Sequence, residues 1–124
     1  MGDWSFEPWG TDEAADWFAV FWRTPDVTLV VDEIERFDPA AERYEALRAA
    51  AYVLASFGSP YTWPDPHLDK LKPLLALAID LLSKMIAPPD ERWGFLDAWC
   101  DDPRAARAVE EQITALQARL DVLA

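Results

Sequence analysis

Carboxylates and tryptophans are the residues of this sequence that could do chemistry, and both are concentrated at its start. The first 22 residues, MGDWSFEPWGTDEAADWFAVFW, carry five carboxylates and four tryptophans but no Lys or Arg. Asp12 and Asp16 stand one helical turn apart, and two carboxylates on one helix face could assist hydrolysis or hold a divalent cation. No Glu-x-x-His segment supplies a partner, and acids at a helix start commonly complement its dipole. We therefore favour a solvated pair over a catalytic one.

The single histidine and the single cysteine offer little further chemistry. His67 stands beside a predicted helix start, where a solvated residue is the commoner case. Cys100 is flanked by Asp97, Asp101 and Asp102, a setting unlike that of a catalytic thiol, so we expect a buried, unreactive side chain. One His and one Cys cannot assemble a zinc site, and the four glycines form no phosphate-binding loop. We predict no catalytic residue, no metal and no cofactor.

The tryptophans allow two interpretations. An aromatic cage beside the acids of residues 12–16 could bind a cation, since each cation–π contact contributes about 0.5–2 kcal/mol. Alternatively the rings are packed, and we expect Trp17 and Trp22 in the core because they share one face of a predicted helix. For the rings in irregular segments both interpretations stay open, because a tryptophan in a loop is also a frequent binding residue. The candidate partner-binding residues are Trp4, Trp9, Asp12, Glu13, Asp16 and Trp63.

Helical periodicity predicts the elements that must position these residues. Apolar residues recur at helical spacing from a cap at Thr11 through Trp22, and again over residues 27–37, although VTLVV has the composition of a strand. Asp-Pro recurs at 38–39, 65–66 and 102–103, where Asp can cap a helix and Pro can begin it. The segments that follow predict helices over 40–57, 73–86 and 103–123, with a short amphipathic helix in ERWGFLDAWC.

These elements predict an all-α fold. At 124 residues, 52% of them hydrophobic, the chain can bury one core. We expect a compact single-domain bundle of about five or six helices over 1–124, in which residues 1–10 form an irregular Trp-rich N-terminal arm. The most apolar run is too short to span a bilayer, and the start of the sequence has acids where a signal peptide has basic residues. With a single Cys, this predicts a cytoplasmic protein.

The opening MGDWSFEPWGTDEAADWF resembles the start of a family of mostly bacterial proteins, the domain of unknown function 4259. Its members typically begin Met-Gly-x-Trp and continue with Gly/Asn-Asp-x-Ala-x-Asp-Trp/Phe; the family's usual Gly-Thr-Gly is replaced here by SFEPWG. The later helical segments are also similar, so the likeness covers most of the chain. It implies a fold and an intracellular bacterial origin more than an activity. The residues that carry the pattern are Gly2, Trp4, Gly10, Asp12, Ala14, Asp16 and Trp17.

The formal net charge of −12 at pH 7 indicates the kind of partner. It disfavours nucleic acids and anionic membranes, which need Lys and Arg, whereas it favours rapid, steered association with a basic protein. The favoured interpretation is a non-enzymatic acidic protein-binding module, most concretely an immunity or antitoxin-like inhibitor of a basic bacterial toxin or effector. The alternatives are a small-ligand or cation sensor that uses a Trp/carboxylate pocket, and a carboxylate-dependent hydrolase.

Overall fold

The computed structural model describes residues 5–23 and 25–123, and every regular element in these ranges is a helix. No strand occurs there, so the all-α prediction is confirmed, and residues 5–10 form an irregular arm ahead of the first helix. The described elements, in chain order, are α1 (Asp12–Arg23), α2 (Val27–Glu35), η1 (Pro39–Ala41), α3 (Tyr44–Phe57), η2 (Asp65–Lys70), α4 (Leu71–Ile86), α5 (Phe95–Ala98) and α6 (Pro103–Leu123), where η denotes a 3₁₀-helix.

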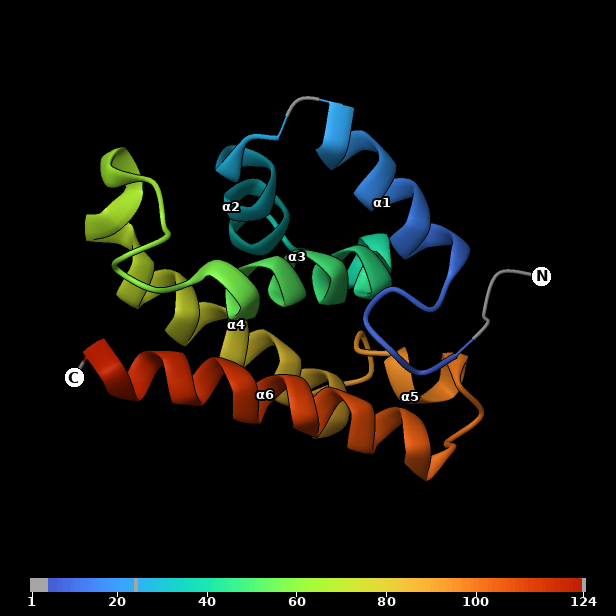
Figure 1. The fold of residues 1–124 in the computed structure, drawn as a ribbon. Helices are drawn as coiled ribbons and strands as arrows, with labels where there is room; N and C mark the ends of the chain where they lie inside the picture. Colours follow the sequence, from blue (N-terminus) through green and yellow to red (C-terminus); the bar gives the residue numbers. More distant parts are fainter. Residues whose placement is uncertain (1–4, 24, 124) are drawn as a thin grey trace.

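Helix α3 is the centre of the fold. In Figure 1, α1 and α2 lie above it and α4 and α6 below it, and α3 contacts all four. Its sequence AAAYVLASF is apolar on almost all sides, as expected for a helix enclosed by others. Ala46, Ala49, Ala50 and Ala51 have no exposed surface, and such small side chains let the neighbouring helices approach closely. Below α3, α4 and α6 run side by side in opposite directions.

The first two helices begin at side-chain caps. Thr11 Oγ1 accepts a hydrogen bond from the Ala14 N–H at 3.1 Å, and Asp26 Oδ1 accepts one from the Thr28 N–H at 2.9 Å. The helix predicted over VTLVV is therefore confirmed as α2, although valine and threonine favour strands. Val30, Val31 and Ile34 are buried on its inner face, so packing outweighs local propensity here.

The Asp-Pro dipeptides begin different kinds of helix. Asp102 accepts the Arg104 N–H at 2.9 Å, and α6 begins at Pro103 as predicted. The first two dipeptides begin only the 3₁₀-helices η1 and η2, so the start expected near residue 40 is wrong: α3 begins at Tyr44. Helix α4 begins two residues before Pro73, which fits in the first turn because an N–H there has no intrahelical acceptor.

The last helices complete the lower layer. The short helix expected in ERWGFLDAWC contracts to the four residues of α5, and α6 then extends for 21 residues. In the described part of the chain, no helix combines the length and the apolar character that crossing a membrane would require.

Candidate functional site

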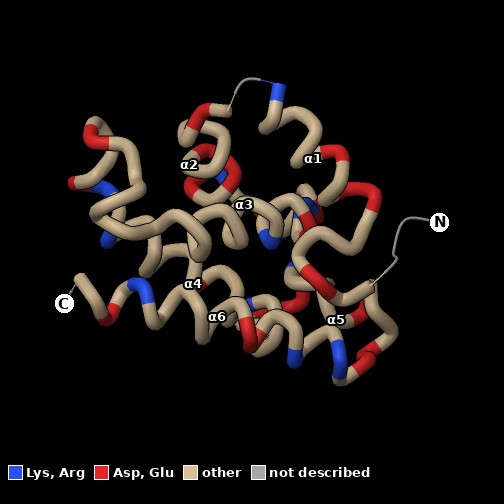
Figure 2. Tube along the Cα trace, in the orientation of Figure 1, with Lys and Arg blue, Asp and Glu red and all other residues tan. Residues whose placement is uncertain are grey.

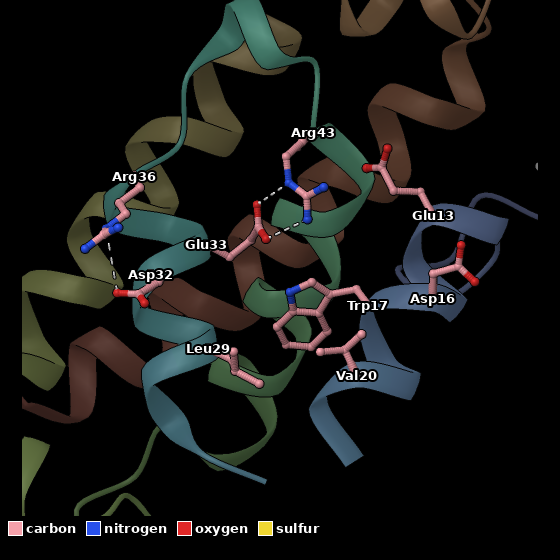
Figure 3. Close-up of a pocket in the computed structure, with 9 residues that line it drawn as sticks. All are labelled: Glu13, Asp16, Trp17, Val20, Leu29, Asp32, Glu33, Arg36 and Arg43. Carbon is pink, nitrogen blue, oxygen red and sulfur yellow. Dashed lines mark hydrogen bonds and ion pairs between the residues drawn. The ribbon is translucent and has the colours of Figure 1, made fainter. Parts of the chain in front are cut away.

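A cleft of about 800 Å³ lies between α1 and α2 (Figure 3). Its apolar side chains are Trp17 and Val20 from α1 and Leu29 from α2, which point toward one another between the two helices. Charged side chains surround this apolar floor. They are Glu13 and Asp16 from α1, Asp32, Glu33 and Arg36 from α2, and Arg43 from the residue before α3.

The charges of this α1–α2 cleft are only partly paired. Arg43 Nε and Nη2 donate to the two carboxylate oxygens of Glu33 at 3.1 and 2.9 Å, and this bond raises the pKa of Arg43. Arg36 Nε lies 3.9 Å from Asp32 Oδ1, an exposed pair that contributes little. Asp16 is exposed and makes no ion pair or hydrogen bond with any described side chain. With four carboxylates and two guanidinium groups, the lining carries an excess of negative charge.

Glu13 has a structural task as well. Its Oε2 accepts the backbone N–H of Ala46 at 2.7 Å, in the first turn of α3. The residue at the N-cap of α3, Arg43, makes no side-chain cap hydrogen bond. Glu13 therefore satisfies an otherwise free N–H of α3 from a different helix, and it fixes the start of α1 against the start of α3.

No family model, curated protein or solved structure matches this chain. The resemblance to the domain of unknown function 4259 therefore stays a prediction.

Four of the predicted binding residues are divided among three separate pockets. Glu13 and Asp16 line the α1–α2 cleft, whereas Asp12 is exposed at the first residue of α1 and is not part of its lining. Trp9 is 47% exposed and lines a groove of about 280 Å³ between the arm, α3 and α6. Trp63 is only 4% exposed and lines a third pocket. Trp4 lies outside the described residues.

Two expectations about single side chains are wrong. Trp17 is buried as predicted, but Trp22 is 63% exposed, because α1 turns only Ala14, Trp17 and Phe21 fully toward the core. Cys100 is exposed, not buried. It has a left-handed backbone, with φ 55°, and lies in the turn between α5 and α6, outside the helix that was predicted to contain it.

The sequence interpretation missed a polar cluster around Arg48, which is fully buried in α3. Its guanidinium donates to Gln112 Oε1 at 2.7 Å, to Glu45 Oε1 at 3.3 Å and to the backbone oxygen of Phe6 in the arm. Gln112 Nε2 returns a hydrogen bond to Arg48 O at 2.9 Å. Gln112 lies on the buried face of α6 together with Val109 and Leu116. A polar residue at the helical spacing of these apolar residues is the sequence signal that could have revealed the buried cluster.

The geometry offers little to metal chemistry. Within residues 5–23 and 25–123, no three side chains of His, Cys, Asp or Glu come together as a metal site. His67 is half-buried in η2, away from the α1–α2 cleft lining.

Proposed function

We propose that this chain is a non-enzymatic, acidic protein-binding module whose partner is a basic protein that docks on the α1–α2 cleft. The observation that carries the proposal is the combination of an apolar floor with a rim that has more carboxylates than guanidinium groups. Asp16 is the lining carboxylate that bonds to no described side chain. Glu33 is held by Arg43, and Glu13 caps α3. Asp32 lies 3.9 Å from Arg36.

Charge supports a basic partner. Acidic residues lie along the first half of α1 and again on α2 (Figure 2). The formal net charge of the whole chain is −12. Such a field accelerates encounter with a positively charged protein and repels nucleic acids. A Lys or Arg of the partner can lay its aliphatic stem on Val20 and Leu29 while its charged end pairs with Asp16.

Exposed apolar side chains of α1 supply contact area. Val20 is 47% exposed within the lining, and Trp22, near the end of the same helix but outside the lining, is 63% exposed. Interfaces commonly combine an aromatic anchor with a charged rim, and tryptophan is the residue most enriched among binding hot spots. In its most concrete form the proposal is an immunity or antitoxin-like inhibitor that covers the positively charged active site of a bacterial toxin or effector.

The distribution of the candidate residues favours this function over the two alternatives. A cation cage would need several aromatic rings around one pocket with the carboxylates. Among the described residues, Trp17 is the one aromatic side chain in the lining of the α1–α2 cleft and is only 8% exposed, whereas Trp9 and Trp63 line other pockets. The carboxylate pair considered for a hydrolase, Asp12 and Asp16, does not converge, because only Asp16 lines the cleft.

The test is to express the chain with the products of its neighbouring genes, purify any complex and measure its association and dissociation rates. Asp16→Lys is expected to slow association about tenfold or more at low salt, and Val20→Ala to speed dissociation. Asp69→Lys is the matched control, because Asp69 is an exposed acid on η2, outside the lining. A complex that loses the same affinity with either lysine variant would contradict docking at this cleft.

A further inference from the structure

A small apolar pocket lies on another part of the surface, where the ends of α1 and α3 meet the start of α2. Its volume is about 190 Å³. Side chains from three helices and from the loop after α3 form its walls, among them Phe21, Val27, Val30, Val53, Phe57 and Trp63. An enclosed apolar cavity of about 150 Å³ is enough to bind benzene in a protein, so a single aromatic ring is the natural size of occupant here.

One polar group in this apolar wall has no partner. Trp63 is 4% exposed, and its indole Nε1 is buried without a hydrogen-bond acceptor among the described residues. A buried N–H donor is almost always hydrogen-bonded, because leaving it unpaired destabilises the fold. A phenylalanine would fill the same wall without that penalty. The Nε1 atom has almost no exposed surface, so a ligand can use this donor only when a wall residue moves aside.

The neighbouring polar side chains are already engaged. Asp26 Oδ1 caps α2 through the Thr28 N–H at 2.9 Å, and Thr62 Oγ1 donates to the Phe57 backbone oxygen at 2.8 Å. Asp26 is among the residues that line the pocket, and its negative charge disfavours an anionic occupant. The pocket can therefore offer a ligand apolar contacts and one unpaired hydrogen-bond donor.

We propose that this Trp63 pocket binds a small, neutral, mainly apolar molecule that carries one hydrogen-bond acceptor, such as an aryl ketone, with the acceptor on Trp63 Nε1. Phe57 is 49% exposed at the pocket, so it is the wall that can move outward to admit the ring. The proposal is independent of the basic partner, because the residues of this pocket do not line the α1–α2 cleft.

Two probes of the same shape test the acceptor. Acetophenone carries a carbonyl oxygen where α-methylstyrene carries a CH₂ group, and ¹H–¹⁵N spectra of the full chain report on each indole N–H separately. Acetophenone is expected to move the Trp63 indole resonance downfield and to bind about five- to tenfold more tightly than α-methylstyrene. Benzoate is expected to bind more weakly than acetophenone because of Asp26.

Variants decide whether Trp63 is responsible. Trp63→Phe keeps an aromatic wall but removes the donor, so it assigns the resonance and should abolish the preference for acetophenone. Trp9→Phe is the matched control, because Trp9 lies in a different groove, and it should leave the preference unchanged. Val27→Phe, which adds bulk to the half-buried pocket wall, should weaken both probes and serves if Trp63→Phe fails to fold. Equal affinity of the two probes, or shifts confined to other indoles, would overturn the proposal.

Discussion

Arg48 holds a positive charge in the interior through partners from three parts of the chain. Glu45 comes from its own helix, Gln112 from α6 and the Phe6 carbonyl from the arm. Burial lowers the pKa of Arg48, whereas the neighbouring Glu45 carboxylate acts in the opposite direction. A buried charge is costly to desolvate, and it becomes more costly when a partner is removed, so these contacts specify how the arm, α3 and α6 meet.

We expect Arg48→Met to lower the free energy of unfolding by about 3 kcal/mol, because it leaves Gln112 Oε1 and the Phe6 carbonyl without their donor. Urea denaturation followed by circular dichroism measures this. Arg48→Met combined with Gln112→Leu should recover part of the loss, since two apolar side chains then replace the polar pair. A single variant as stable as the wild type would mean that the buried network contributes nothing.

Single side chains were the hardest feature to predict from the sequence. The periodicity of α3 indicates a buried helix, but an arginine in it is normally assigned to the surface. Two of the groups that make its burial possible, Gln112 and the Phe6 carbonyl, lie 64 and 42 residues away. Glu13 illustrates the same limit. Its position in the first turn of α1 predicts a dipole complement, yet its acceptor role belongs to α3, which the local pattern does not contain.

At the scale of elements, the arm is held by Phe6 and not by its exposed tryptophan. The Phe6 ring lies 5.0 Å from the ring of Trp99, and the Arg104 guanidinium lies 4.8 Å above it in a cation–π contact. Among the described residues Trp9 has one ring contact, edge-on to Tyr52 at 5.2 Å, and nearly half of its surface is exposed. In the described part of the arm, Phe6 is therefore packed against the fold, whereas Trp9 stays largely on the surface.

We expect Phe6→Ala to destabilise the fold by about 2 kcal/mol, because it removes a ring packed between Trp99 and Arg104. Trp9→Ala should cost less than about 1 kcal/mol, since little buried surface is lost. Thermal and urea denaturation of both variants tests this order. If Trp9→Ala were the more damaging change, Trp9 would be the latch of the arm and a poor candidate for partner binding.

The start of α6 should be sensitive to acid. Hydrogen bonds from Arg104 lower the pKa of Asp102 below the ordinary value of 3.8. The bonds from the Arg104 side chain have the larger effect, and the bond from its backbone N–H adds to it. Because the folded pKa is depressed, the ionised carboxylate stabilises the folded state above that value, and the contribution is lost as the pH falls through the folded pKa.

Asp102→Ala should therefore lower the melting temperature at pH 7, and the gap to the wild type should narrow once the pH falls below 3.8. Asp102→Asn is the control, because its amide oxygen can still cap α6 without titrating. Melting curves recorded by circular dichroism from neutral pH down to about pH 2.5 give the comparison. A gap between Asp102→Ala and wild type that stays constant with pH would exclude a titrating contribution from this carboxylate.

The elements themselves were predictable, since periodicity and caps are local. Apolar spacing located α1, α2, α4 and α6, and Asp102 marked the start of α6. The error near residue 40 has a local cause as well: an Asp-Pro pair satisfies a 3₁₀ turn as readily as an α-helix, and Glu42, which ends η1 with φ 56°, breaks the continuation. Trp22 was misplaced because the width of the buried stripe depends on how many neighbours α1 has, which only tertiary packing decides.

For the whole molecule, charge was predictable but its organisation was not. The sequence indicates an acidic protein, and Glu13 and Asp16 were among the candidate binding residues chosen from it. The α1–α2 cleft also needs Leu29, Asp32, Glu33 and Arg43, which come together only because α1 and α2 both pack on α3. No spacing rule connects residues 13–20 with residues 29–43 before that packing is known.

The net charge itself should limit stability. With 23 carboxylates and 11 Lys or Arg residues, repulsion between like charges outweighs the few exposed ion pairs, each worth about 0–1 kcal/mol. Sodium chloride screens both, with a Debye length near 10 Å at about 0.1 M, so it should raise the melting temperature at pH 7 between about 10 and about 150 mM.

The same salt should have opposite effects on folding and on binding, which separates the two roles of this charge. Added sodium chloride should stabilise the isolated chain while it slows association with a basic partner, because one process relieves repulsion and the other loses attraction. Asp16→Lys should reduce both effects, since it removes negative charge from the α1–α2 cleft, where α1 and α2 approach each other. Melting curves and association rates at matched salt concentrations provide the measurement. A melting temperature that falls with salt would show that attractive ion pairs dominate the folded surface. In that case the excess negative charge would not destabilise the free chain, and a basic partner would have no such repulsion to relieve.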